Sequence, residues 1–138
     1  LVKSSAASDV YKRQTVESEV PPVIKEKMVA ANSSQTTRSR SRTGKHSRQL
    51  VSPWTQAWES EQAPDPLPMP LQPMVAEPAL QKVAKLAEGG HDGARDLATY
   101  WVGQGVGLMN QSISASDVVQ EFKEDFVEAY ERLTGFVS

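Results

Sequence analysis

The chain has 138 residues, of which 38% are hydrophobic and 23% are charged, a composition that allows one domain with a modest core. It contains no cysteine, which excludes disulfide bonds, thiol catalysis and thiolate metal sites. Only His46 and His91 could supply an imidazole ligand, and neither lies in a metal-ligand spacing, so no metal site is expected. No apolar run is long enough to span a membrane and no signal peptide is visible, so we expect a cytoplasmic protein with no membrane partner.

Charge is unevenly distributed along the chain. Residues 1–50 contain ten Lys and Arg against four Asp and Glu, giving +6, whereas residues 51–138 contain five against thirteen, giving −8. An excess of basic residues at one end can mark a nucleic-acid-binding arm, but it can equally be one basic loop beside acidic helices.

The first 14 residues do not resemble the start of a natural protein. Residues 9–14 can be back-translated as GAT GTG TAT AAG AGA CAG, which looks like the transposase-end sequence used in sequencing-library preparation. We therefore expect residues 1–14 to be a non-native, adaptor-derived tail. The alternative is an ordinary disordered N-terminus.

A short surface helix is predicted within residues 15–31. Ser18 or Glu19 can cap it, and the two prolines that follow suit a first helical turn. Its apolar stripe, at helical spacing, is formed by Ile24, Met28 and Ala31.

Residues 32–49 form a polar, basic run in which Lys and Arg are separated by Ser, Thr and Gly. The run superficially resembles an Arg–Ser tract for RNA, but no aromatic residue is interleaved to stack on bases. We predict a solvated basic loop, with an RNA-binding segment as the alternative. Beyond it, Trp54 and Trp58 lie four residues apart, which suits a short helix anchored by two indole rings.

Six of the nine prolines fall within residues 63–78. This density argues against a regular helix or an inner strand, so we predict an extended, polyproline-like strap. A proline-rich ligand for an SH3-type domain is a weaker alternative, because flanking cations are lacking. Residues 79–88 then carry an apolar stripe at helical spacing that ends at Gly89 and Gly90, which predicts a helix.

The next segment, residues 94–110, is predicted to be a helix that carries three of the eight glycines. At helical spacing, Trp101 and Gln104 share an apolar face with Leu97 and Leu108. Because glycine weakens a helix by about 1 kcal/mol relative to alanine, its presence here indicates close approach of the backbone to another element or to a flat ligand. Tight helix packing with a satisfied core glutamine and a pocket wall are both compatible with this pattern.

The last helix is predicted to follow Ser114, which opens a Ser-x-x-Asp capping box, and to end at Gly135. One face is acidic and is interpreted as a solvated surface. The opposite face is apolar and needs a protein body to pack on. The apolar residues are Val118, Val119, Phe122, Phe126, Ala129, Tyr130 and Leu133.

Several motifs occur in one order along the chain: Thr15 to Val20, Thr43-Gly44-Lys45-His46-Ser47-Arg48 with Trp54 and Trp58, the strap at 66–72, Trp101-Val102-Gly103-Gln104-Gly105-Val106-Gly107-Leu108, and Ser114-Ala115-Ser116-Asp117-Val118-Val119. Together they resemble the C-terminal region of the nitronate monooxygenases, also called 2-nitropropane dioxygenases. The resemblance covers about residues 15–134 and is collinear, which a single motif would not be.

That resemblance implies an α/β fold, a (β/α)8 TIM barrel that binds FMN at the C-terminal ends of its strands and oxidises alkyl nitronates with oxygen. The expected fold class of this chain is mainly α with a long irregular Pro-rich strap, as the C-terminal remnant of such an FMN-binding barrel. Residues 15–62 would be the last barrel helix plus the basic loop. Residues 63–78 would be the strap, and residues 79–138 the C-terminal helical region.

The family's catalytic histidine and phosphate-binding glycines lie upstream of the motifs present here, so no catalytic residue is assigned and neither histidine receives a role. The resemblance implies FMN contacts for Gln104 as an amide donor, for Trp101 as an apolar wall and for Gly103 as a point of close backbone approach. The complete enzyme would take a small-molecule nitronate and oxygen, whereas this fragment alone is expected to be inactive.

Three alternatives are also compatible with the sequence. The first is an RNA-binding basic segment, and the second is a free-standing helical interaction module. The third is a related flavin reductase that acts on quinones or enoyl thioesters on the same barrel.

Overall fold

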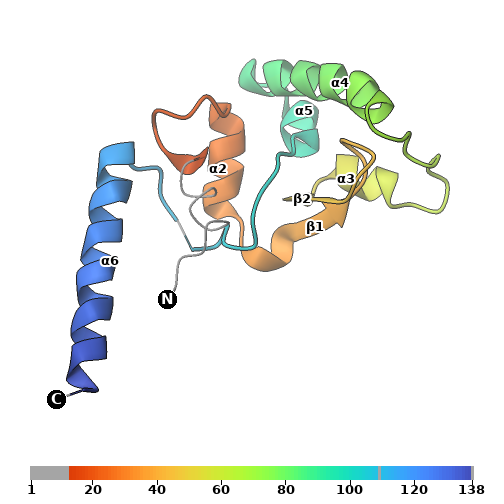
Figure 1. Cartoon of the computed structure of the whole chain (residues 1–138). Helices are drawn as coiled ribbons and strands as arrows, with labels where there is room; N and C mark the ends of the chain where they lie inside the picture. The colour runs from red at the N-terminus through yellow and green to blue at the C-terminus, as the bar shows by residue number, and fades with distance from the viewer. Residues whose placement is uncertain (1–12, 109, 138) are drawn as a thin grey trace.

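The computed structural model describes residues 13–108 and 110–137, which form a mainly helical chain with one small sheet (Figure 1). Most of the predicted adaptor-derived tail, residues 1–12, lies outside the described residues. Within the described part, no helix combines the length and the apolar character that a membrane span requires. The elements are α2 (Pro22–Ala30), the 3-10 helix η1 (Ser33–Gln35), β1 (Thr36–Ser39), β2 (Ser47–Leu50), α3 (Pro53–Trp58), α4 (Leu71–Glu88), α5 (Asp92–Leu97) and α6 (Ala115–Gly135).

Helix α2 supplies the centre of the hydrophobic core. Its Ile24 and Met28 are buried against Leu50 and Val106, which confirms the predicted apolar stripe. The predicted cap is wrong, because the helix begins after Pro21 with no side-chain capping bond. Ser18 instead donates its hydroxyl proton to the Arg13 carbonyl, 2.6 Å away.

The basic run folds into an antiparallel hairpin, in which Thr36 of β1 pairs with Leu50 of β2. The tip of the hairpin lies against the proline-rich segment. Gly44 has φ +77°, and a Cβ atom on it would collide with the Leu67 carbonyl, so only glycine fits there. The prediction of a wholly solvated loop is therefore wrong. A hairpin becomes stable only when further structure packs on it, and here the rest of the chain provides that structure.

The predicted glycine-bearing helix over residues 94–110 is also wrong. Helix α5 ends at Leu97, and the chain then runs extended alongside β2. The Leu50 amide donates to the Tyr100 carbonyl at 3.1 Å, and the Val102 amide donates to the Arg48 carbonyl at 3.1 Å. These bonds satisfy the backbone groups that an isolated hairpin would leave unpaired, and residues poor in helix propensity lose little by leaving the helix.

Helix α4 begins eight residues earlier than predicted, at Leu71, so the extended strap is shorter than expected. The buried side chain of Gln72 explains the early start. Its amide nitrogen donates to the Ser41 carbonyl at 2.7 Å, and its oxygen accepts from the Leu67 amide at 3.0 Å. Pro73 lies in the first turn, where a helix needs no backbone donor, and Pro78 is tolerated on an exposed face. The predicted stripe farther along is confirmed, with Leu80 and Ala87 buried and Gly89 ending the helix.

Helices α3 and α6 form where the sequence predicted them. In α3 the rings of Trp54 and Trp58 lie 6.1 Å apart. In α6 the Ser114 hydroxyl accepts from the Asp117 amide at 3.1 Å, as expected for the capping box. Only Val118 of α6 is buried, and the helix projects away from the body (Figure 1).

Lys27 joins α2 to the C-terminal end of α5. Its ammonium group donates to the carbonyls of Arg95, Asp96 and Ala98 at 2.7, 2.9 and 2.7 Å. These are the carbonyls that a helix C-terminus leaves without intrahelical donors. Burial lowers the pKa of Lys27 below its usual value, and the Asp96 carboxylate acts in the opposite direction. The ammonium group therefore acts as a cap between two elements 68 to 71 residues apart.

We expect Lys27→Met to lower the free energy of unfolding by about 1–3 kcal/mol, because the methionine keeps the apolar stem but leaves the carbonyls unsatisfied. Urea unfolding followed by tryptophan fluorescence would measure this loss. Lys82→Met, at an exposed position of α4, is the matched control and should change stability by no more than about 0.5 kcal/mol. Equal stabilities of the two variants would contradict the capping role.

Candidate functional site

The candidate site is built around the extended segment that follows α5. Trp101 forms an isolated antiparallel bridge with Gln49 of β2, which fixes its backbone. Its indole meets the Tyr100 ring edge-on, with 5.5 Å between the ring centroids. The guanidinium of Arg42 lies over the indole face, 3.7 Å from its centroid, and 5.1 Å from the centroid of Tyr100. Two aromatic rings and one cation therefore form a single cluster.

Arg42 is almost completely buried, and its charge is balanced by Glu77 of α4. The Arg42 Nε donates to one carboxylate oxygen at 2.6 Å, and Nη2 donates to the other at 3.0 Å. This bidentate geometry matches the planar guanidinium, which can also stack on an aromatic face. A lysine could not make both contacts at once. We call Arg42, Glu77, Tyr100 and Trp101 the Arg42 cluster.

A second arginine approaches the same strand from the N-terminal side. The Arg13 Nη1 donates to the Trp101 carbonyl at 2.9 Å, and its guanidinium lies 5.9 Å from the Tyr100 ring centroid. Arg13 belongs to the predicted adaptor-derived tail, so in a chain with a different residue at this position the contact would be different. The origin of residues 1–14 stays a prediction.

Several buried polar groups have no hydrogen-bond partner within the described residues, and one of them belongs to Gln49, which bridges to Trp101. The Gln49 side chain is fully buried, and its nitrogen donates to the Ser47 hydroxyl at 3.2 Å. Its oxygen has no hydrogen-bond partner within the described residues, and the same holds for the Trp54 indole nitrogen and both side-chain polar atoms of Gln14. Such groups cost free energy unless another molecule or segment satisfies them.

The three predicted FMN contacts do not share one helix face, because the segment is not helical. Trp101 is partly exposed, with one face of its ring covered by Arg42. Gly103 is partly exposed and opens a turn in which its carbonyl accepts from the Val106 amide at 3.3 Å. Gln104 is exposed at this turn. The predicted apolar stripe through Leu97, Trp101, Gln104 and Leu108 therefore does not exist.

Close backbone approach, which the glycines predicted, does occur at Gly107. A Cβ atom there would lie 3.2 Å from the Cα of Asn32. This contact packs the glycine segment against the start of η1, so the glycine serves protein packing at this position.

The two histidines stand apart from this site. The His91 Nδ1 accepts from the Ala94 amide at 3.2 Å and caps α5. His46 is exposed at the hairpin tip. Within the described residues, no group of His, Asp and Glu has the arrangement of a metal site.

The described residues do not by themselves form a flavin site. The cavity beside Arg42, Tyr100 and Leu80 has a volume of about 100 Å³, far below the roughly 300–1,000 Å³ of small-molecule sites. A flavin phosphate would need a helix N-terminus with free amides, but Ser52, His91 and Ser114 cap α3, α5 and α6. At α6 the Ala115 amide already donates to the Glu17 carboxylate at 2.9 Å. This part of the chain could supply one wall of such a site.

Sequence reasoning missed Arg42, Glu77 and Gln49. Arg42 is one of several arginines in a run with alternating serines, and nothing local distinguishes it from Arg38 or Arg40. Glu77 precedes a proline in a segment predicted to be a strap. Their pairing across 35 residues has no signature in a single sequence.

Comparison with known protein families shows to which family this chain belongs. A family model described as nitronate monooxygenase matches residues 14–125. The chain belongs to the nitronate monooxygenase family. It is also 46% identical over 124 residues to Rv1533 of Mycobacterium tuberculosis, which is provisionally named a monooxygenase. That match covers 89% of this chain and 33% of the relative, so the chain spans about a third of the length of its relative.

Solved structures with a similar fold agree with membership of the nitronate monooxygenase family. FabK from Thermotoga maritima, a TIM-barrel flavoenzyme, superposes with a TM-score of 0.61 at 28% identity, over 90% of this chain and 37% of FabK. A single-residue variant of the same FabK gives a TM-score of 0.57 at 24% identity, over 90% of this chain and 33% of the variant, and supports the fold alone. The family and its structural neighbours are flavin-dependent oxidoreductases.

We expect Arg42→Lys to destabilise the chain although the charge is kept, because lysine loses the second Glu77 bond and the stacking on Trp101. Loss of a hydrogen bond to a charged group costs about 1.5–3 kcal/mol, measurable by urea unfolding followed by indole fluorescence. Arg38→Lys, at an exposed position of the same hairpin, is the control.

A double-mutant cycle of Arg42→Lys with Glu77→Gln should give a coupling energy of about 0.5–3 kcal/mol. Strictly additive effects of the two substitutions would show that the pair contributes nothing to stability.

Proposed function

We propose that this chain is the C-terminal part of an FMN-dependent nitronate monooxygenase that oxidises alkyl nitronates with molecular oxygen. The family match over residues 14–125 is the observation that carries the proposal. Because the chain spans about a third of its relative, the remaining barrel, the catalytic histidine and the phosphate-binding glycines would belong to the rest of the enzyme.

In that enzyme, the role of this chain is to position the turn at residues 103–107 near the cofactor. Hydrogen bonds to β2 and the Arg42 cluster hold the preceding strand rigidly, which supports a fixed position for the turn. Gln104 projects from this turn and would donate its amide, Trp101 would form an apolar wall, and Gly103 would let the backbone come close. FMN itself, when bound, supplies the redox chemistry.

Exposed apolar side chains support a larger protein around this chain. At the start of α4, Leu71, Met74 and Val75 are 49%, 71% and 59% exposed. An exposed apolar patch on one element usually marks contact with another protein segment. We infer that the rest of the barrel covers this end of α4.

The RNA-binding alternative receives little support from the hairpin. Arg42 is committed to Glu77 and Trp101, and the Arg48 Nη1 donates to the Thr36 hydroxyl at 2.8 Å. Two of the basic residues are thus engaged within the protein, which reduces the number of charges available to neutralise phosphates.

Steady-state kinetics on the complete enzyme tests the proposed function. Oxygen consumption with propyl-2-nitronate, without a nicotinamide nucleotide, is the expected activity. Nicotinamide-dependent reduction of a quinone or an enoyl thioester, with no nitronate turnover, would overturn the proposal in favour of a related reductase.

The 138-residue chain by itself should bind no FMN at micromolar concentrations, because its own side chains cap the N-termini of α3, α5 and α6 and the cavity beside Arg42 is too small for a flavin. Quenching of flavin fluorescence on titration with the chain measures this directly. A stoichiometric complex with a dissociation constant of about 1 μM, equivalent to roughly 8 kcal/mol of binding free energy, would contradict it.

Gln104→Ala in the complete enzyme should leave stability almost unchanged, because the side chain is exposed here and surface substitutions rarely exceed about 0.5 kcal/mol. If the amide donates to the flavin or the nitronate, turnover should fall by about 10²–10³-fold. Kinetics and a thermal melt of the same variant separate the two effects. Gln111→Ala, an exposed amide in the same connection, is the control, and equal turnover of both variants would remove Gln104 from the site.

A further inference from the structure

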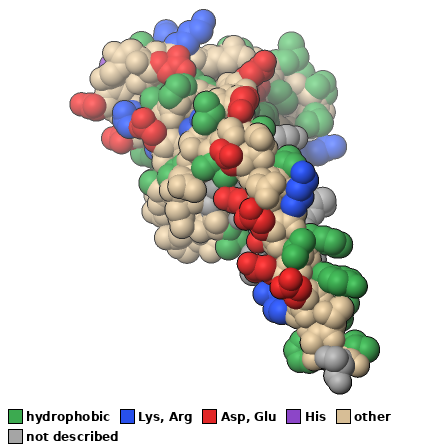
Figure 2. Space-filling model, turned by 90° about the vertical axis from the view of Figure 1, so that its left-hand side faces the viewer, with side chains coloured by type: hydrophobic (Ala, Val, Ile, Leu, Met, Phe, Trp, Pro, Cys, Tyr) green, Lys and Arg blue, Asp and Glu red, His purple; other side chains and the backbone are tan. Residues whose placement is uncertain are grey.

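Helix α6 carries an apolar seam that is exposed over most of its length, and only Phe122 near its start is partly buried, in the cluster around Val118. Figure 2 shows apolar side chains along one edge of the projecting helix and acidic side chains along another. Phe126, Leu133 and Phe136 are 71%, 63% and 88% exposed. Such large exposed aromatic and aliphatic groups in a row indicate a docking surface.

The seam follows a seven-residue repeat rather than a general amphipathic pattern. Val119, Phe126 and Leu133 are spaced by seven and occupy one position of the heptad. Phe122, Ala129 and Phe136 are spaced by seven and occupy a second position, three residues after the first. Alternating steps of three and four are the a and d positions of a coiled coil. The repeat therefore favours another helix as the occupant.

The charged residues beside the seam indicate which helix pairs with α6 and whether the two helices run parallel or antiparallel. We propose that α6 pairs with α6 of a second copy of this chain as an antiparallel two-helix coiled coil. In that arrangement Asp125 of each copy lies opposite Arg132 of the other, twice across the two-fold axis. In a parallel pair, Asp125 would face Tyr130 and Arg132 would face Val137, so no opposite charges would meet.

Side-chain size also fits the antiparallel register. Phe126 of one copy meets Ala129 of the other, so a large residue lies opposite a small one. The remaining layers are Phe122 with Leu133 and Val119 with Phe136. Each layer occurs twice, which gives a continuous seam along the helix.

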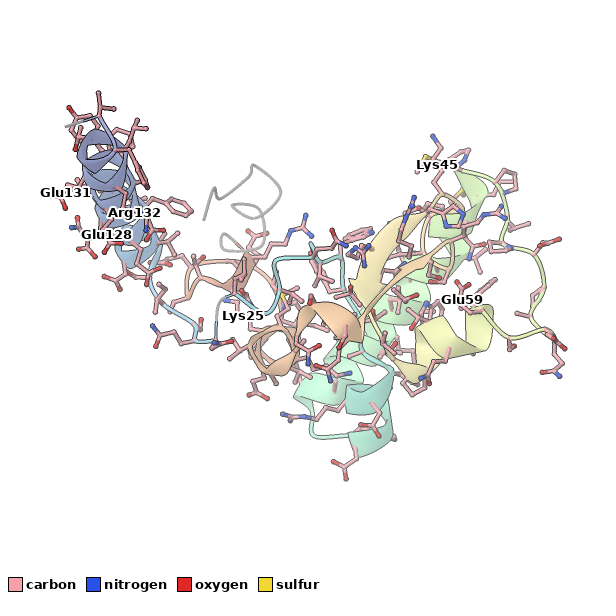
Figure 3. The ribbon with its side chains drawn as sticks, turned by 90° about the horizontal axis from the view of Figure 1, so that it is seen from below. Lys25, Lys45, Glu59, Glu128, Glu131 and Arg132 are labelled. Atoms are coloured by element: carbon pink, nitrogen blue, oxygen red, sulfur yellow. The ribbon has the colours of Figure 1, made fainter. Side chains whose placement is uncertain are left out.

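The opposite face of α6 excludes a lipid surface as the occupant. It carries Glu121, Glu124, Glu128 and Glu131, and Figure 3 shows Glu128, Glu131 and Arg132 projecting from the helix. Helices that lie on membranes carry Lys and Arg on the polar face to meet anionic lipid. In the antiparallel pair, the acidic faces of the two copies point away from each other.

The remaining candidate occupant is the rest of a longer enzyme. Four of the six seam residues, Phe126, Ala129, Leu133 and Phe136, lie beyond residue 125, where the match to the family model ends. The family model therefore leaves most of the heptad uncovered, although the match to the relative covers 89% of the chain, so the oligomeric state decides between the two occupants. The pairing is independent of the proposed nitronate chemistry.

Sedimentation equilibrium of the 138-residue chain from about 1 μM to 1 mM tests the proposal. We expect a monomer–dimer equilibrium that Phe126→Glu weakens by at least tenfold. Val127→Glu is the matched control, since it adds the same charge at the next residue, which is exposed but lies off the seam. Far-UV circular dichroism of each variant checks that α6 remains helical.

Two further variants test the direction. Arg132→Asp should weaken the dimer, and adding Asp125→Arg should restore it. Because the chain has no cysteine, a nitroxide on Thr134→Cys reports on both copies. The antiparallel register displaces the two labels along the axis by about 20 Å, at 1.5 Å per residue, whereas a parallel pair places them side by side.

A monomer at every concentration would overturn the proposal and assign the seam to the rest of a longer enzyme. A dimer that Phe126→Glu leaves intact, or labels that lie side by side, would overturn it equally.

Discussion

The buried guanidinium of Arg42 is the interaction on which the body of this chain depends. It links the hairpin to α4 through Glu77 and to the strand after α5 through Trp101. None of these three segments is stable alone, since a hairpin needs further packing and α4 exposes much of its own apolar surface. A charge held by two parallel hydrogen bonds and an aromatic face tolerates few alternative geometries, so it fixes how the segments meet.

The course of the glycine segment follows from that arrangement. Once Trp101 lies beside β2, the backbone of residues 98–102 is committed to strand hydrogen bonds, and the chain must turn immediately afterwards. Gly107 then lets the backbone pass close to Asn32. The consequence for function is that Gln104 lies at an exposed turn on a rigid base. In a nitronate monooxygenase family chain that spans a third of its relative, such a turn is suited to meet groups supplied by the rest of the protein.

Helix α6 contrasts with the body, because its capping and helical periodicity are local while most of its apolar seam is exposed. The helix forms because Ser114 caps it and most residues favour helix. The helix that packs on the seam is not part of α6 itself. The heptad and its flanking charges are the part of the sequence that specifies this partner. The body thus buries its apolar side chains in its own core, whereas α6 presents its apolar side chains to another helix.

The sequence by itself determined what depends on neighbours three or four residues apart: the stripe of α2, the end of α4 at Gly89, and the capped start of α6. Its collinear motifs also determined the family, because motif residues are visible without coordinates. The tertiary structure alone decided the route of residues 98–108, the early start of α4 and the burial of Arg42. Each of these depends on a partner distant in sequence, respectively β2, the Ser41 carbonyl and Glu77. Propensity and periodicity describe a segment in isolation, and a hydrogen bond across 31 residues can override both.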